Sequence, residues 1–94
     1  MTKQDLVSEI SKITGIEKVT VMKTIEALMD TVKTSMASNK NVYLRGFGTF
    51  LVKKRAKKTA RNISKNTTII IPEHFVPIFK PAKEFMNKVK TIKI

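Results

Sequence analysis

The sequence is poor in several residue types, and each shortage narrows the range of possible functions. It contains no cysteine and one histidine, His74, which excludes disulfides and thiolate metal sites and makes any metal site unexpected. No apolar run approaches the roughly 20 residues that a membrane-spanning helix needs. No segment resembling a signal peptide follows the first residues. We therefore expect a cytoplasmic protein that has no membrane partner.

Acidic residues are also scarce. The 94 residues include 7 Asp and Glu against 19 Lys and Arg, so the formal net charge is +12. The few acids are scattered, and Ser, His and Asp form no recognisable catalytic set. A nuclease would need clustered carboxylates to hold its metal ions. We expect no enzymatic activity, no cofactor and no small-molecule substrate.

The segment between Asp30 and Glu73 contains no acid at all. Its basic residues are densest in residues 53–61, and Asn62 and the apolar Ile63 follow them directly. A solvated surface usually mixes charges of both signs, and this segment does not. It therefore needs an anionic partner, and the phosphate backbone of a nucleic acid suits it best.

The first 40 residues predict a helical hairpin. Thr2 and Asp5 match a capping-box pattern, and Gly15 is a natural helix stop, so the first helix should span residues 3–14. A longer apolar stripe at three- and four-residue steps predicts a second helix with a poorly capped start, ending in a turn at residues 39–41. Its members are Val21, Ile25, Leu28, Met29, Val32 and Met36.

From Val42 the apolar pattern changes to a period of two, which indicates β-structure. Two strands flank the turn Gly46-Phe47-Gly48, and Thr67–Ile71 should return as a third strand. The basic segment then forms one leg of a long hairpin with its tip near residues 62–67. Residues 41–80 would thus be a three-stranded antiparallel sheet extended into a β-arm. A short helix should follow over residues 81–90, with 91–94 fraying.

These elements predict a single α+β domain spanning residues 1–94. Within one chain, the third strand and the tip have almost nothing to pack against, and an isolated two-stranded hairpin is marginal in water. A long hairpin that protrudes from a small core suits the gripping of a partner.

Several motifs, in this order and spacing, resemble the bacterial HU/IHF family of histone-like DNA-bending proteins. They are Gly46-Phe47-Gly48-Thr49-Phe50, Lys54-Arg55-Ala56, Arg61-Asn62 and Phe79-Lys80-Pro81-Ala82-Lys83. The resemblance implies an intertwined, obligate dimer, either a homodimer or a heterodimer with a paralogue. It also implies that two arms wrap double-stranded DNA in the minor groove, and that an apolar wedge at each tip kinks it. Such proteins organise the nucleoid with little sequence specificity.

The resemblance also assigns roles to individual residues. Along the arm, basic side chains would track phosphates or enter the minor groove, Asn62 would shape the tip, and Ile63 would be the wedge where most members have proline. Three lysines would clamp bent DNA on the flank of the body, and Arg45 could reach the minor groove. The DNA-binding set is Lys3, Arg45, Lys53, Arg55, Lys57, Lys58, Arg61, Asn62, Ile63, Lys80 and Lys83.

Two alternative functions stay open. Some IHF-like subunits have arginine at the position of Arg45, which favours a sequence-preferring DNA-bending regulator. High basicity also suits an RNA-associated protein. Residues 45–48 imitate the start of an RNA-recognition motif, but that fold places a strand before its first helix. We expect the four phenylalanines Phe47, Phe50, Phe79 and Phe85 to form core and dimer contacts rather than base-stacking platforms.

Overall fold

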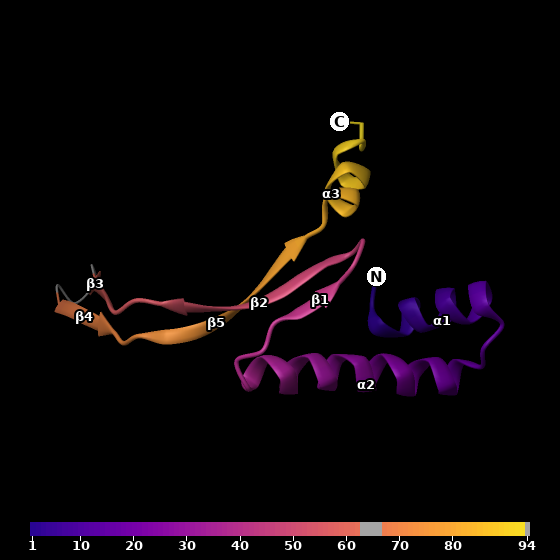
Figure 1. Cartoon of the computed structure of the whole chain (residues 1–94), viewed down its shortest axis with the longest axis horizontal. Coiled ribbons are helices and arrows are strands. Elements are labelled where there is room, and N and C mark those ends of the chain that lie inside the picture. Colours follow the sequence, from indigo (N-terminus) through magenta and orange to yellow (C-terminus); the bar gives the residue numbers. More distant parts are fainter. Residues whose placement is uncertain (63–66, 94) are drawn as a thin grey trace. The chain divides into compact units, whose positions relative to one another are not determined.

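The computed structural model describes residues 1–62 and 67–93, with side chains for 1–60 and 67–93. The described residues form three helices and five strands, and the fold is α+β as expected (Figure 1). The chain divides into two compact units, Met1–Ser35 and Met36–Ile94.

Helix α1 (Lys3–Thr14) has both predicted end signals. The Thr2 hydroxyl accepts a hydrogen bond from the Asp5 N–H at 3.2 Å, and the Asp5 carboxylate accepts one from the Thr2 N–H at 2.9 Å. Both hydrogen bonds lower the pKa of Asp5, and the bond from the Thr2 backbone N–H has the larger effect. Gly15 ends the helix at φ 75°, and its N–H donates to the Ser11 carbonyl. The predicted span of residues 3–14 is confirmed.

Helix α2 spans Lys18–Ala37, and Asn39 in the turn that follows it has a positive φ of 61°. Among the described residues, only Val7 and Val21 are buried hydrophobic side chains. Further along the predicted stripe of α2, the Leu28 side chain is 51% exposed and the Met29 side chain 40%. The helices of this unit thus bury a small core and leave much of the α2 stripe uncovered.

The second unit contains two antiparallel sheets. Strands β1 (Val42–Leu44), β2 (Gly48–Arg55) and β5 (His74–Pro81) form the first, in the order β1-β2-β5. Strands β3 (Lys58–Asn62) and β4 (Thr67–Ile71) form the second. The expected three-stranded antiparallel sheet that extends into a β-arm is confirmed, although the returning leg contains the further strand β5 beyond the expected Thr67–Ile71. Strand β5 was missed because Pro77 weakens its strand signal, yet β5 lies at a sheet edge, where proline is tolerated.

The two sheets share one register. Arg55 pairs with His74, and Lys58 pairs with Ile71, three residues further along each leg. The strands are interrupted only at residues 56–57 and 72–73, where Pro72 has no N–H to donate. The last described pair is Asn62 with Thr67. We call this hairpin, residues 53–76, the arm; its pairing register is the same on both sides of the interruption.

Helix α3 (Lys83–Lys90) begins two residues later than predicted, because Pro81 still pairs with Gly48 in the sheet. The Ala82 N–H donates to the Phe47 carbonyl at 2.9 Å, which joins the start of the helix to the β1–β2 turn. Four phenylalanine rings gather between the sheet and α3, with centroids 4.8–6.0 Å apart. The four rings contact one another, but Phe47 is 47% exposed and Phe79 37% exposed, so within the single chain they do not form a buried core, and their dimer contacts stay a prediction.

Candidate nucleic-acid interface

Strands β2 and β5 form a ladder with two different faces. Side chains alternate along each strand, and directly paired residues share a face. The unbroken register from Gly48–Pro81 to Arg55–His74 therefore separates the side chains into two sets. One face, called the basic face below, carries Lys53, Arg55, His74 and Lys80, together with Thr49 and the apolar Leu51, Val76 and Ile78. The apolar face carries Phe50, Val52, Phe75, Pro77 and Phe79, together with Lys54.

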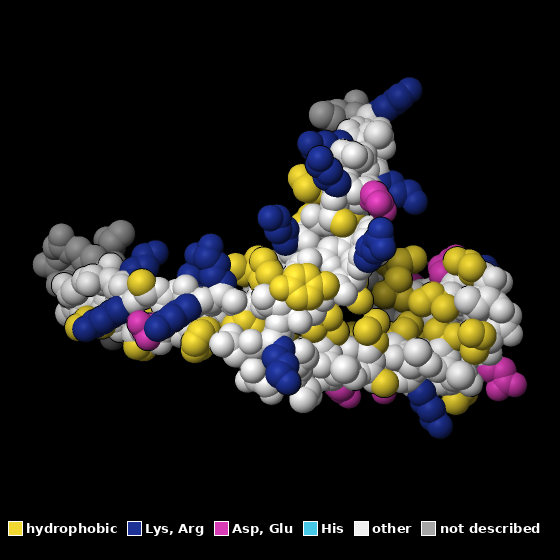
Figure 2. Space-filling view, in the orientation of Figure 1, with side chains coloured by type: hydrophobic (Ala, Val, Ile, Leu, Met, Phe, Trp, Pro, Cys, Tyr) yellow, Lys and Arg dark blue, Asp and Glu magenta, His cyan; other side chains and the backbone are white. Residues whose placement is uncertain are grey.

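Exposed basic side chains follow the leading leg of the arm (Figure 2). Lys53 and Arg55 lie in β2, Lys57 lies in the interruption, and Lys58 opens β3. All four are exposed. The structure thus brings four of the predicted DNA-binding residues onto one continuous hairpin, where they can meet successive phosphates of a backbone.

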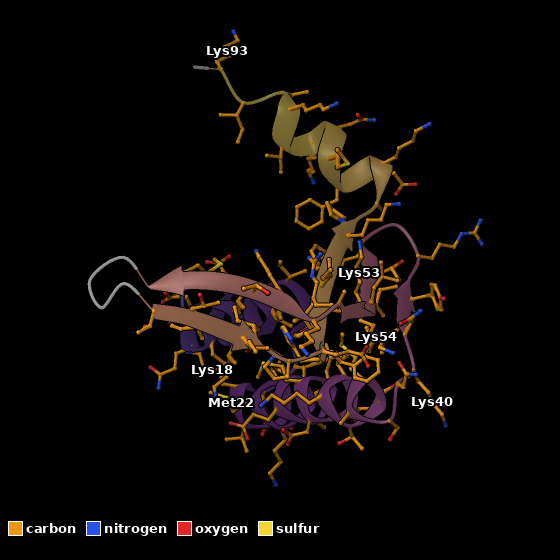
Figure 3. The ribbon with its side chains drawn as sticks, turned by 90° about the vertical axis from the view of Figure 1, so that its left-hand side faces the viewer. Lys18, Met22, Lys40, Lys53, Lys54 and Lys93 are labelled. Atoms are coloured by element: carbon orange, nitrogen blue, oxygen red, sulfur yellow. The ribbon has the colours of Figure 1, made fainter. Side chains whose placement is uncertain are left out.

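The one acid of the arm, Glu73, forms an ion pair with Lys54 at 3.0 Å. Both side chains are more than half exposed, and an exposed pair of this kind is weak. Lys53 and Lys54 are consecutive residues of β2 (Figure 3), so their side chains belong to opposite faces, and only Lys53 belongs to the basic face. Lys54 is therefore a partly neutralised neighbour of the basic face.

Three further predicted residues belong to the same unit as the arm. Lys80 pairs with Thr49 at the body end of β5, and Lys83 is the first residue of α3. Arg45 directly follows β1 and precedes Gly46, which turns the chain at φ 83°. Their roles toward DNA stay predictions.

The remaining predicted residues are placed differently. Lys3 belongs to the first unit, where its ammonium group contacts the Glu26 carboxylate at 3.2 Å. The backbones of Arg61 and Asn62 pair with Thr68 and Thr67. The side chains of Arg61 and Asn62, and the whole of Ile63, lie outside the described residues, so the predicted wedge is not placed.

His74 is the residue of the basic face that the sequence interpretation missed, because it was considered only as a metal ligand. Its ring is exposed, it pairs with Arg55, and its Nδ1 lies 2.9 Å from the Pro72 carbonyl oxygen. Side chains alternate along a strand, so residues 74 and 80 share a face. Accepting Pro77 in an edge strand would therefore have placed His74 beside Lys80 on the sequence alone. Among residues 1–62 and 67–93, no group of three potential His, Cys, Asp or Glu ligands surrounds a metal position.

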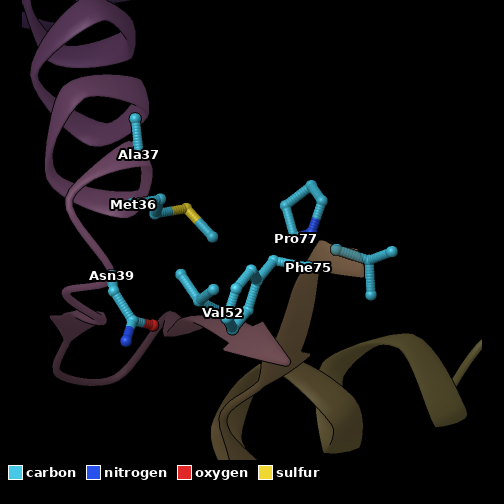
Figure 4. A pocket seen from close by; sticks show the side chains of 7 residues that line it. Met36, Ala37, Asn39, Val52, Phe75 and Pro77 are labelled. Atoms are coloured by element: carbon cyan, nitrogen blue, oxygen red, sulfur yellow. The ribbon is translucent and has the colours of Figure 1, made fainter. Parts of the chain in front are cut away.

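The apolar face continues into a groove of about 330 Å³ (Figure 4). Phe75 in this groove is 61% exposed, and Phe79 further along the same face is 37% exposed. An apolar surface of this kind is usually covered by a partner. The groove is lined by Met36, Ala37, Asn39, Val52, Phe75, Val76 and Pro77.

Two N-terminal helices, a sheet extended into a basic two-stranded arm and a C-terminal helix define a class of small α+β proteins with a β-arm. The family model described as bacterial DNA-binding protein matches residues 1–90. The chain therefore belongs to this family, and the resemblance to HU and IHF proteins is confirmed. Membership of a family of DNA-binding proteins also confirms that the chain is not an enzyme.

Individual relatives agree with this assignment. DNA-binding protein HU of Thermus thermophilus is 39% identical over 90 residues, covering 96% of this chain and 93% of the relative. Integration host factor subunit beta of Marinobacter nauticus is 36% identical, covering 95% and 92%. An Anabaena HU–DNA cocrystal structure matches with a TM-score of 0.91 at 29% identity, covering 98% and 100%. In the described residues, no helix is long and apolar enough to cross a membrane.

Proposed function

We propose that this chain is an architectural DNA-binding protein that holds duplex DNA with its arm in the minor groove and bends it. The observation that carries the proposal is the single register of the arm, which keeps Lys53 and Arg55 on one exposed face beside His74. The similar HU protein of Anabaena was crystallised with DNA, which supports the same partner here. Contacts of this type position DNA without identifying its sequence, so binding should be broad.

Salt dependence tests the phosphate contacts. Each contact contributes a slope of about −0.9 to the plot of log affinity against log salt. If each of the five basic residues proposed along one arm meets a phosphate, that arm contributes about −4.5 to the slope. These residues are Lys53, Arg55, Lys57, Lys58 and Arg61. We expect a steep slope for a duplex in a fluorescence titration, and stronger binding to bent or nicked duplex than to an RNA hairpin. A flat salt profile or tighter RNA binding would contradict the proposal.

We also propose that Ile63 is the wedge that kinks the DNA. Inserting an apolar side chain between base pairs costs a few kcal/mol of unstacking, which the bent DNA repays through added protein contacts. The change Ile63→Ala should therefore reduce the bend angle, measured by fluorescence transfer between the DNA ends, more than it weakens binding. Ile63→Pro, which restores the residue most family members have, is the matched control and should retain bending. Unchanged bending in Ile63→Ala would exclude the wedge.

A sequence-preferring variant of the same function is the second candidate. It is favoured by Arg45 next to the β1–β2 turn and by the similarity to an integration host factor subunit. Minor-groove readout distinguishes A·T from G·C pairs. Competition between A·T-rich and random duplexes, repeated with Arg45→Ala, separates the sequence-preferring regulator from the non-specific protein. A preference for A·T-rich duplex that Arg45→Ala abolishes supports the regulator. Equal affinities for the two duplexes support the non-specific protein.

The working unit is proposed to be a dimer of this chain. Only two hydrophobic side chains are buried among the described residues, while Leu28, Phe75 and Phe79 are exposed. A domain of this size needs a larger core or oligomerisation to be stable. A second copy would cover these surfaces and supply a second arm. An organising role in the nucleoid would follow from this activity.

A further inference from the structure

We propose that His74 is a proton-dependent phosphate ligand, so that the chain binds DNA more tightly as the pH falls from about 8 to about 6. This inference rests on the proposed DNA binding and adds a regulatory property to it. His74 is exposed on the basic face, directly opposite Arg55 in the ladder between β2 and β5. A phosphate held by Arg55 would thus lie within reach of the imidazole.

The hydrogen bond of the ring determines which charge state can bind. The Pro72 carbonyl oxygen can only accept, so the Nδ1 atom 2.9 Å away must carry the hydrogen. The neutral ring then has a lone pair on Nε2, which is an acceptor and cannot bind a phosphate oxygen. Protonation at Nε2 turns this atom into a charged donor. The contact with Pro72 therefore makes the second nitrogen the one that titrates and binds.

The surrounding charges favour such a coupling. Arg55 lies opposite His74, Lys53 lies two residues along β2 on the same face, and Lys57 lies in the interruption next to them. The adjacent acid, Glu73, is engaged by Lys54 of the opposite face at 3.0 Å. A phosphate bound at this face would bring negative charge beside the ring, so proton uptake by His74 should accompany DNA binding.

Few other groups titrate in this range. Histidine side chains ordinarily change charge between about pH 5 and 8, whereas lysine and arginine stay charged. An N-terminal amino group also titrates there, and it is the same in all variants of His74. A difference between the wild-type chain and a His74 variant therefore isolates the imidazole.

The test measures duplex affinity near pH 6 and near pH 8 at fixed salt for the full chain, His74→Gln and His74→Lys. The wild-type chain should bind roughly three- to tenfold more tightly near pH 6, with a salt slope steeper by about 0.9 for each imidazole that gains a proton. His74→Gln should bind at the weaker level at both pH values. His74→Lys, which is always charged, should bind at the tighter level at both.

A second measurement uses calorimetry in buffers of different ionisation enthalpy, which counts protons taken up on binding. We expect uptake by the wild-type chain in excess of that by His74→Gln. Equal pH dependence in the wild-type chain and His74→Gln, or equal proton uptake, would overturn the role of His74 while leaving DNA binding in place. If no variant binds duplex at either pH, the proposed function itself fails.

Discussion

At the residue scale, Gly48 shows how one backbone position organises the base of the arm. A Cβ atom added there would lie 2.6 Å from two ring atoms of Phe79 and 2.7 Å from the Lys80 carbonyl oxygen. The ring could turn aside, but the carbonyl belongs to the ladder that pairs Gly48 with Pro81. Glycine is needed here because of this close approach, whereas Gly15 is needed for its positive φ of 75° and has open space around it.

We predict that Gly48→Ala destabilises the protein by about 1–3 kcal/mol, as overpacking of a filled site usually does. Thermal unfolding at one fixed protein concentration measures the change, because the stability of a dimer depends on concentration. Near-ultraviolet circular dichroism should also change, since the phenylalanine cluster must move. The matched control is Gly15→Ala, which strains the backbone without touching the aromatic rings and should leave that spectrum intact. Wild-type stability in Gly48→Ala would contradict the prediction.

At the element scale, the sequence was informative wherever local signals agree. The capping pair of Thr2 and Asp5 and the glycine at 15 predicted α1 to the residue. Strand β4 was found from its β-branched residues. Strand β5 was missed because its hydrogen bonds come from β2, whose paired residues lie 19 to 33 positions earlier in the chain, and a local pattern interrupted by Pro77 does not reveal that pairing. The basic segment was predictable, but the assignment of Lys53 and Lys54 to different faces depended on the register.

The arm also contains its own counter-ion, Glu73, which competes with DNA for Lys54. We predict that Glu73→Gln strengthens duplex binding roughly two- to fivefold, because an exposed pair is worth at most about 1 kcal/mol. If the pair persists in the complex, the salt slope should also steepen by about 0.9 as Lys54 becomes available for a phosphate.

Lys54→Gln and the double variant complete a cycle that isolates the pair. Glu73→Gln should lose most of its effect when Lys54 is already replaced. An equal gain from Glu73→Gln in both backgrounds would show that Glu73 acts only through the overall charge of the arm.

At the scale of the whole molecule, the exposed apolar side chains predict that folding and association occur together. Leu28 lies on the α2 stripe and is 51% exposed in the single chain, so a second copy packed on this stripe would cover it. We predict that the wild-type chain sediments at twice its chain mass of 10.7 kDa. Leu28→Asp should weaken association at least tenfold, because burying an unpaired carboxylate is costly.

Thr34→Asp is the matched control, since it adds the same charge to an exposed position of α2 away from the apolar stripe. It should remain dimeric in sedimentation equilibrium. Circular dichroism on the same samples shows whether the dissociated chains stay folded or unfold. We expect them to unfold, because neither chain alone has a sufficient core. A wild-type chain that stays folded as a monomer at micromolar concentration would show that these apolar surfaces need no second copy. The bending of DNA would then have to be explained with one arm.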